Sequence, residues 1–111
     1  MNTKVTEKWL RNHGWKKTVD NIEEVEKCKS YTTTKHHVVY EFDSGDSFAR
    51  LDHTVYNSKW THDKSIMKRS NYYMFFAYSE KTGWKVENRI SHRAPDEDTI
   101  KAGMRVVGIV M

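Results

Sequence analysis

Polar and apolar residues alternate with a period of two in the middle of the chain, which predicts a β-hairpin. Between residues 32 and 42 the even positions, among them Val38 and Tyr40, form one face of an extended strand and the odd positions form the other. Residues 43–46, Asp-Ser-Gly-Asp, favour a tight turn, and the alternation resumes over residues 47–56. We therefore expect strands at 32–42 and 47–56, paired antiparallel.

The second half of the chain predicts three more strands. Residues 72–78 are apolar or aromatic on both faces, which is typical of a central strand. Gly83 ends a turn before an alternating strand at 84–90. Pro95 and the acidic residues after it indicate the first turn of a short helix, which we expect to end at Gly103 before a terminal strand at 104–111.

The first thirty residues predict one or two helices. Thr6 is a suitable cap for a short helix that ends at Gly14 and has an apolar face at Trp9 and Leu10. Residues 20–30 have apolar positions at helical spacing behind an aspartate cap, so a helix is expected there. A strand that begins near Val25 is the competing interpretation, because Tyr31 and the threonines after it favour extended structure.

These elements predict one α+β domain over residues 1–111, with an antiparallel sheet of about five strands and two or three short helices. A small five-stranded β-barrel is the alternative. The stretch from Ile100 to Val110 resembles the glycine turn that leads into a strand in many small barrels. The expected core consists of apolar residues on the inner faces of the strands: Tyr40, Phe42, Phe76, Trp84, Val86 and Val107.

Composition excludes several classes of protein. With 13% aromatic residues the chain is unlike a disordered protein, and with 31% charged residues it is unlike a membrane protein. Cys28 is the single cysteine, so an intramolecular disulfide and a cysteine-based zinc site are excluded. Residues 1–7 lack the apolar centre of a secretory signal. We expect a soluble cytoplasmic protein, similar in composition to small proteins of phages and mobile elements.

Charge is distributed unevenly along the chain, whose formal net charge is +4. Residues 20–46 carry seven acidic and three basic residues, whereas residues 47–94 carry nine basic and four acidic residues. Such a separation favours one positive face, which is suited to an anionic partner. Residues 57–71, where the alternation is lost, are expected to form a loop or a short helix around 63–69.

A basic segment interleaved with aromatic residues is the most informative candidate site. Cations neutralise phosphates and aromatic rings stack on unpaired bases, so this pattern predicts contact with single-stranded DNA or RNA. The opposing interpretation is that Trp60, Ile66 and Met67 pack on the core and leave the lysines merely solvated. The predicted contact residues are Lys59, Trp60, Lys64, Lys68, Arg69 and Tyr73, joined by Arg89 and Arg93.

The six histidines suggest metal binding or acid–base chemistry. His37 and His53 are expected as neighbours on one face of the first hairpin near Asp52. Two histidines and one carboxylate could form a metal site, but we interpret their proximity as chance. A metal-independent nuclease needs a general base, a general acid and a cation that binds phosphate. These groups could come from His53 or His62 with Lys59, or from His92 beside Arg93.

No nucleophile motif and no phosphate-binding glycine loop occurs in the sequence. We therefore predict no catalytic residue, no metal and no cofactor, and favour a non-enzymatic protein that binds nucleic acid. One alternative is a protein-interaction module or inhibitor, of phage or mobile-element type, that blocks a nucleic-acid-binding or nucleic-acid-processing protein. Its acidic segment 20–46 would engage the basic groove of that partner. The small nuclease is the second alternative. The oligomeric state is open.

Overall fold

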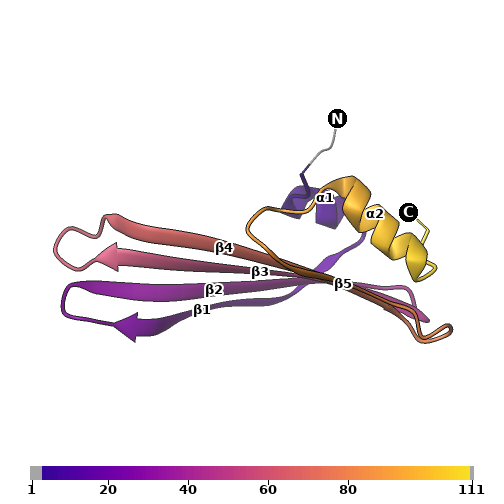
Figure 1. Ribbon diagram of the computed structural model, residues 1–111, viewed down its shortest axis with the longest axis horizontal. Coiled ribbons are helices and arrows are strands. Elements are labelled where there is room, and N and C mark those ends of the chain that lie inside the picture. The colour runs from indigo at the N-terminus through magenta and orange to yellow at the C-terminus, as the bar shows by residue number, and fades with distance from the viewer. Residues whose placement is uncertain (1–3, 111) are drawn as a thin grey trace.

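Five antiparallel strands form one open sheet, and two helices lie on one of its faces (Figure 1). The computed structural model describes residues 4–110, with all side chains except those at 88–91. The sheet follows chain order, with each strand hydrogen-bonded to the next: β1 (Lys16–Lys27), β2 (Tyr31–Asp43), β3 (Ser47–Trp60), β4 (Ile66–Ser79) and β5 (Lys85–Ser91). The helices are α1 (Glu7–Asn12) and α2 (Glu97–Val106). An α+β domain with five strands is confirmed in outline, and the barrel alternative is wrong because the sheet is open.

The central strands are much longer than the helices, so the helices cover only one end of the sheet (Figure 1). β3 and β4 each have 14 residues, whereas α2 has ten. At about 3.4 Å per strand residue and 1.5 Å per helix residue, this is roughly 47 Å against 15 Å. The described chain accordingly measures 53 × 31 × 23 Å. We call the face under the helices the helix face, the opposite one the open face, and the end away from the helices the far end.

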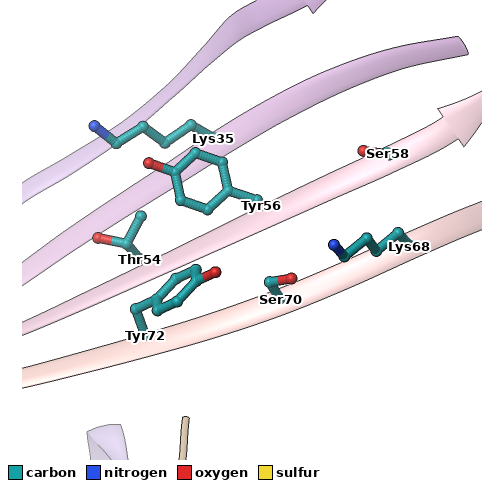
Figure 2. Close-up of a pocket in the computed structure, with 7 residues that line it drawn as sticks. All are labelled: Lys35, Thr54, Tyr56, Ser58, Lys68, Ser70 and Tyr72. Atoms are coloured by element: carbon teal, nitrogen blue, oxygen red, sulfur yellow. The ribbon is translucent and has the colours of Figure 1, made fainter. Parts of the chain in front are cut away.

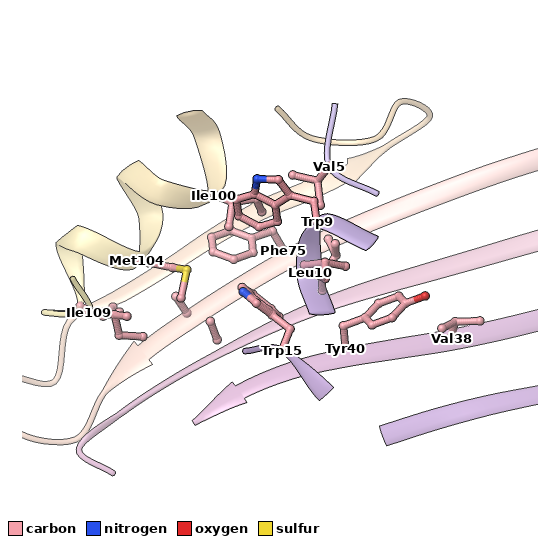
Figure 3. Close-up of a cluster of buried hydrophobic side chains, with 14 residues drawn as sticks. Val5, Trp9, Leu10, Trp15, Val38, Tyr40, Phe75, Ile100, Met104 and Ile109 are labelled. Carbon is pink, nitrogen blue, oxygen red and sulfur yellow. The ribbon is translucent and has the colours of Figure 1, made fainter. Parts of the chain in front are cut away.

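The core lies between the two helices and the near end of the helix face (Figure 3). Trp9 and Leu10 come from α1, and Ile100 and Met104 come from α2. Alternation in the strands points Tyr40, Leu51 and Phe75 at the same space. The cluster is completed by Val5, Trp15, Val38, Ala49, Ala77, Val107 and Ile109. These contacts bury apolar surface, which is the main favourable term in folding.

Two segments of expected helix or loop are strands instead. Residues 20–30 were expected to form a helix, yet most of them belong to β1, which pairs with β2 along its length. Residues 57–71 were expected to form a loop or a short helix, yet they complete β3, turn at 61–65 and begin β4. Pairing with a neighbouring strand overrides local helical spacing in both segments.

The C-terminal segment is helical where a turn and a strand were expected. Gly103 lies inside α2, so the expected terminal strand at 104–111 and the likeness to a barrel turn are both wrong over the described residues. Val107 and Ile109 are nevertheless buried, because the chain folds back at Gly108 after the helix. Within residues 4–110, neither helix has the length and apolar character needed to span a bilayer.

The expected core is partly right. Tyr40 and Val107 are buried, and Phe42 and Val86 pack partly buried against the core. The prediction of Trp84 is wrong, since it is 63% exposed after the β4–β5 turn. The prediction that Phe76 is a core residue is also wrong. Phe76 is only half-buried on the open face, while its neighbour Phe75 is fully buried.

Gly103 is required because α2 lies directly on Phe75. A Cβ at position 103 would lie 2.5 Å from Cε1 of Phe75. Alanine normally stabilises a helix relative to glycine by about 1 kcal/mol, but overpacking costs about 1–3 kcal/mol. We therefore expect Gly103→Ala to lower the free energy of unfolding in urea titrations, whereas the exposed control Thr99→Ala does not. A Gly103→Ala variant more stable than the parent would contradict this packing.

Candidate functional site

A groove of about 580 Å³ crosses three strands at the far end of the open face (Figure 2). None of the described residues that line it carries a carboxylate. Two of them carry a positive charge, two are tyrosines and three are small hydroxyl residues: Lys35, Lys68, Tyr56, Tyr72, Thr54, Ser58 and Ser70. The groove therefore offers positive charge and aromatic surface together.

The register of the strands explains the shape of this groove. Lys35 of β2 pairs with Tyr56 of β3, which in turn pairs with Ser70 of β4. Ser58 pairs with Lys68 in the next row on the same face. Short hydroxyl side chains therefore alternate with long ones, so that the serines form the floor and the lysines and tyrosines form the rim (Figure 2).

The two tyrosines of the groove already contact each other. Tyr56 and Tyr72 have ring centroids 5.8 Å apart at an interplanar angle of 80°, which is the edge-to-face geometry that aromatic pairs prefer. Both rings are only partly buried. Below them, the hydroxyls of Ser58 and Thr33 lie 2.7 Å apart and are hydrogen-bonded. The floor is thus fixed while the ring surfaces stay accessible.

Aromatic side chains continue from the groove along β4 toward the near end of the open face. Phe76 lies two register positions beyond Met74, and its ring centroid is 6.4 Å from that of Phe48. Lys85 lies over the ring of Tyr78, with Nζ 5.9 Å from the centroid. We call Tyr72, Met74, Phe76, Tyr78 and Phe48 the aromatic strip. Its aromatic residues are partly buried and Met74 is exposed, so the strip extends the surface for stacking.

Among the described residues, three carboxylates pair with residues of the strip. Asp43 pairs with Phe48 and Glu87 pairs with Phe76, and both are exposed, whereas Asp52 is paired with a cation. Asp52, which pairs with Met74, has a side chain only 13% exposed and accepts a hydrogen bond of 2.8 Å from Nε of Arg50. This contact is the largest cause that raises the pKa of Arg50. Asp52 therefore adds little negative potential to the open face.

A second groove, of about 390 Å³, lies at the far end on the side of the helix face. Lys59, Lys64 and Trp60 line it together with Lys27 of β1. Lys64 has a left-handed backbone (φ 62°), and its amide donates to the carbonyl of Trp60 over 2.9 Å. The lining also includes Glu24 and several neutral polar residues: Thr32, Thr34, Asn57 and Thr61.

The structure divides the predicted contact residues between the two faces. Lys68 lines the open-face groove, whereas Lys59, Trp60 and Lys64 line the second groove. Arg69 points away from Lys68, because consecutive strand residues face opposite sides. The remaining predicted residues lie elsewhere: Tyr73 on the helix face, Arg93 between β5 and α2, and Arg89 with its side chain outside the described ones.

Trp60 is 37% exposed, so the alternative that it anchors this segment in the core is wrong. Sequence analysis missed Lys35, Tyr56 and Tyr72. The signal for these residues was the alternation, which continues beyond residue 56 and begins again at Lys68.

The expected pairing of His37 with His53 is not formed. His37 pairs with Thr54 and His53 pairs with Val38, so His37 and His53 lie on opposite faces of the hairpin. His62 lies in the turn at the far end, 3.3 Å from Asp63, well away from the middle of β3, where His53 lies. Among the described residues no three histidine, cysteine or acidic side chains are grouped to hold a metal ion.

His53 makes the stability of the fold depend on pH. Burial is the largest cause that lowers its pKa from the usual value of 6.5, and the charges of His36 and Arg69 lower it further, against a hydrogen bond with Asn71. The unfolded chain therefore binds the proton more tightly, so stability rises with pH in this range. We expect the free energy of unfolding to fall as the pH drops below about 6.5.

Replacing His53 with Gln should remove part of this decline, whereas the exposed control His62→Gln should keep it. Urea titrations at about pH 7.5 and about pH 5.5 measure both. An identical decline in the parent and in His53→Gln would contradict the assignment.

Comparison with known proteins identifies no relative of this chain. Searches of family models, of curated proteins and of solved structures find no match to this chain. A functional assignment therefore depends on the geometry and chemistry of the two grooves.

Proposed function

We propose that this protein binds single-stranded nucleic acid on its open face, with the groove between β2 and β4 as the principal contact. The observation that carries the proposal is the composition of that groove, where Lys35 and Lys68 flank Tyr56 and Tyr72. Lysines neutralise phosphates and release counterions, and tyrosine rings stack on bases. The groove serves both needs in one place.

The accessible rings of Tyr56 and Tyr72 favour a single strand over a duplex. In a duplex the base faces are stacked on one another, so they are closed to Tyr56 and Tyr72, whereas an unpaired strand exposes them. β2 and β4 are two strand spacings apart, which is about 10 Å. Lys35 and Lys68 can therefore contact phosphates on either side of a base that lies over the tyrosines.

A protein partner is the second candidate function, and the exposed edge of the sheet favours it. Every residue of β1 is exposed, and Ile22 is 67% exposed. An extended segment of another protein can pair with such an edge strand. The acidic residues of β1 would then favour a basic partner, as expected for an inhibitor of a nucleic-acid-binding protein: Asp20, Glu23, Glu24 and Glu26.

The salt dependence of binding tests the proposed function. Fluorescence anisotropy of a labelled single-stranded oligothymidylate gives the affinity over a range of salt concentrations. We expect Lys35→Gln/Lys68→Gln to weaken binding and to reduce the slope of log K against log salt by about 1.4, since each single-strand contact contributes about 0.7.

A control with the same loss of charge separates a specific contact from a general effect. Lys8 in α1 and Lys81 in the β4–β5 turn are exposed and lie outside both grooves. Lys8→Gln/Lys81→Gln should therefore change the slope far less. Equal slopes for the two double variants would mean that net charge, and not the groove, governs binding. If the parent protein binds no oligonucleotide, the proposed function is wrong and binding of a protein partner becomes the favoured function.

A further inference from the structure

Two histidines lie side by side on the helix face, just beyond the part that the helices cover. His36 of β2 pairs with Val55 of β3, and His53 of β3 pairs with Val38 of β2. The two histidines are therefore diagonal neighbours on one face, with Cβ atoms about 7 Å apart. Val38 and Val55 are buried between them. The pair thus has a fixed apolar base, and both rings are partly exposed.

His53 is held in the form of a general base. Its Nε2 lies 3.1 Å from Oδ1 of Asn71, so Nε2 carries the hydrogen and Nδ1 keeps a free lone pair. The ring stacks on Tyr73, with centroids 4.1 Å apart and planes at 7°. Burial lowers its pKa, which favours the neutral ring. His53 is thus oriented and able to accept a proton at Nδ1.

His36 is held in the complementary way. Its Nε2 lies 2.5 Å from Oδ1 of Asp20, a carboxylate that also accepts a hydrogen bond of 3.3 Å from Lys17. The contact with His36 is the largest cause that lowers the pKa of Asp20, so this carboxyl is ionised. It accepts the hydrogen of Nε2, so Nδ1 is the ring nitrogen from which a proton can pass to another group.

Positive charge lies next to the histidine pair. Arg69 is on the helix face of β4, two residues before Asn71, and its charge is among the causes that lower the pKa of His53. The second groove, with Lys59 and Lys64, opens farther along the same face. A phosphodiester backbone that follows these cations reaches the histidines.

We propose that His53 and His36 act as general base and general acid in the cleavage of RNA by internal transesterification. His53 Nδ1 takes the proton of a ribose 2′-hydroxyl, whose oxygen forms a bond to the adjacent phosphorus. The bond from phosphorus to the 5′-oxygen breaks, and that oxygen takes the proton from Nδ1 of His36. The products are a 2′,3′-cyclic phosphate and a 5′-hydroxyl, and proton exchange with water restores both rings.

The spacing of diagonal positions on a sheet suits this chemistry. Each catalytic nitrogen must come within about 2.6–3.2 Å of its oxygen, so two nitrogens that flank one phosphate lie several ångströms apart, as diagonal neighbours on a sheet do. Arg69 can stabilise the charge that develops on the phosphate oxygens. DNA lacks the 2′-hydroxyl and would not be cleaved. The inference goes beyond binding and does not require the open-face groove, since it concerns the other face.

A DNA oligonucleotide with one internal ribonucleotide, labelled with a fluorophore and a quencher, tests the proposal. We expect the protein to cleave it at the ribonucleotide and leave a cyclic phosphate, and not to cleave the all-DNA control. His36→Gln and His53→Gln should each lower the rate by about 10²–10⁴-fold. The control His37→Gln, adjacent in sequence but on the opposite face, should keep the parent rate.

Two results would overturn this inference. One is a parent protein that cleaves no faster than the His36→Gln/His53→Gln double variant, and the other is a pair of single variants that cleave at the parent rate. Circular dichroism and binding of the all-DNA oligonucleotide are measured on each variant, so that a loss of folding is distinguished from a loss of catalysis. The His37→Gln variant gives the rate expected when a histidine outside the pair is removed. Binding without cleavage would refute only this inference, and cleavage without a contribution from Lys35 and Lys68 would refute only the open-face proposal.

Discussion

Replacing Phe75 with alanine is expected to lower the free energy of unfolding by about 3–5 kcal/mol, enough to unfold a domain of ordinary stability. The ring is 2% exposed and belongs to the cluster that joins both helices to the sheet (Figure 3). Its removal would leave a cavity under Gly103, whose backbone lies against the ring. Urea titration followed by circular dichroism measures the loss.

The adjacent residue provides a matched control. Phe76 has the same side chain on the same strand, but it faces the open side and is only half-buried. Phe76→Ala should therefore cost clearly less than Phe75→Ala, because less apolar surface is lost. Equal costs, or a larger cost at Phe76, would show that β4 is placed one residue out of register.

Removing both rings of the groove is expected to give the largest loss of binding. Stacking on an aromatic side chain contributes about 1–3 kcal/mol per base, so Tyr56→Ala/Tyr72→Ala should weaken the affinity for a single strand by about thirty-fold or more. The slope of affinity against salt should hardly change, because stacking displaces no counterions. This distinguishes the tyrosines from Lys35 and Lys68.

Phenylalanine keeps the ring and removes only the hydroxyl, so Tyr56→Phe/Tyr72→Phe is the control. It should bind within a few-fold of the parent, provided that stacking is the main contribution. Because the two rings contact each other, the stability of both double variants is measured beside their affinity. If the alanine variant folds and binds as the parent does, the groove is not the binding site.

Local patterns predicted the first hairpin and the first helix because both depend on near neighbours. The Asp-Ser-Gly-Asp turn sets the pairing of β2 with β3, and Thr6 caps α1 by accepting a hydrogen bond from the amide of Trp9 over 3.1 Å. β1 was mistaken for a helix because its apolar residues lie three apart. Its irregular register, with shifts at 17/19 and 24/26, breaks the period of two that would have revealed a strand.

The candidate site was only partly predictable, because it depends on which face of the sheet each residue occupies. The basic segment was recognised as one surface, but Lys68 and Arg69 point to opposite faces. The groove joins Lys35 to Lys68 across β3, and that proximity follows only from the pairing of three strands. The histidine pair is likewise a product of register, since His36 and His53 are seventeen positions apart in the sequence.

Photocrosslinking tests the central claim most directly, namely that the open face of the sheet binds single-stranded nucleic acid. A single-stranded DNA in which thymines are replaced by 5-iodouracil is irradiated with the protein, and the modified residues are identified by mass spectrometry. The account predicts adducts at Tyr56 or Tyr72, with further adducts along the aromatic strip. Adducts confined to Tyr73, on the helix face of the sheet, would contradict it.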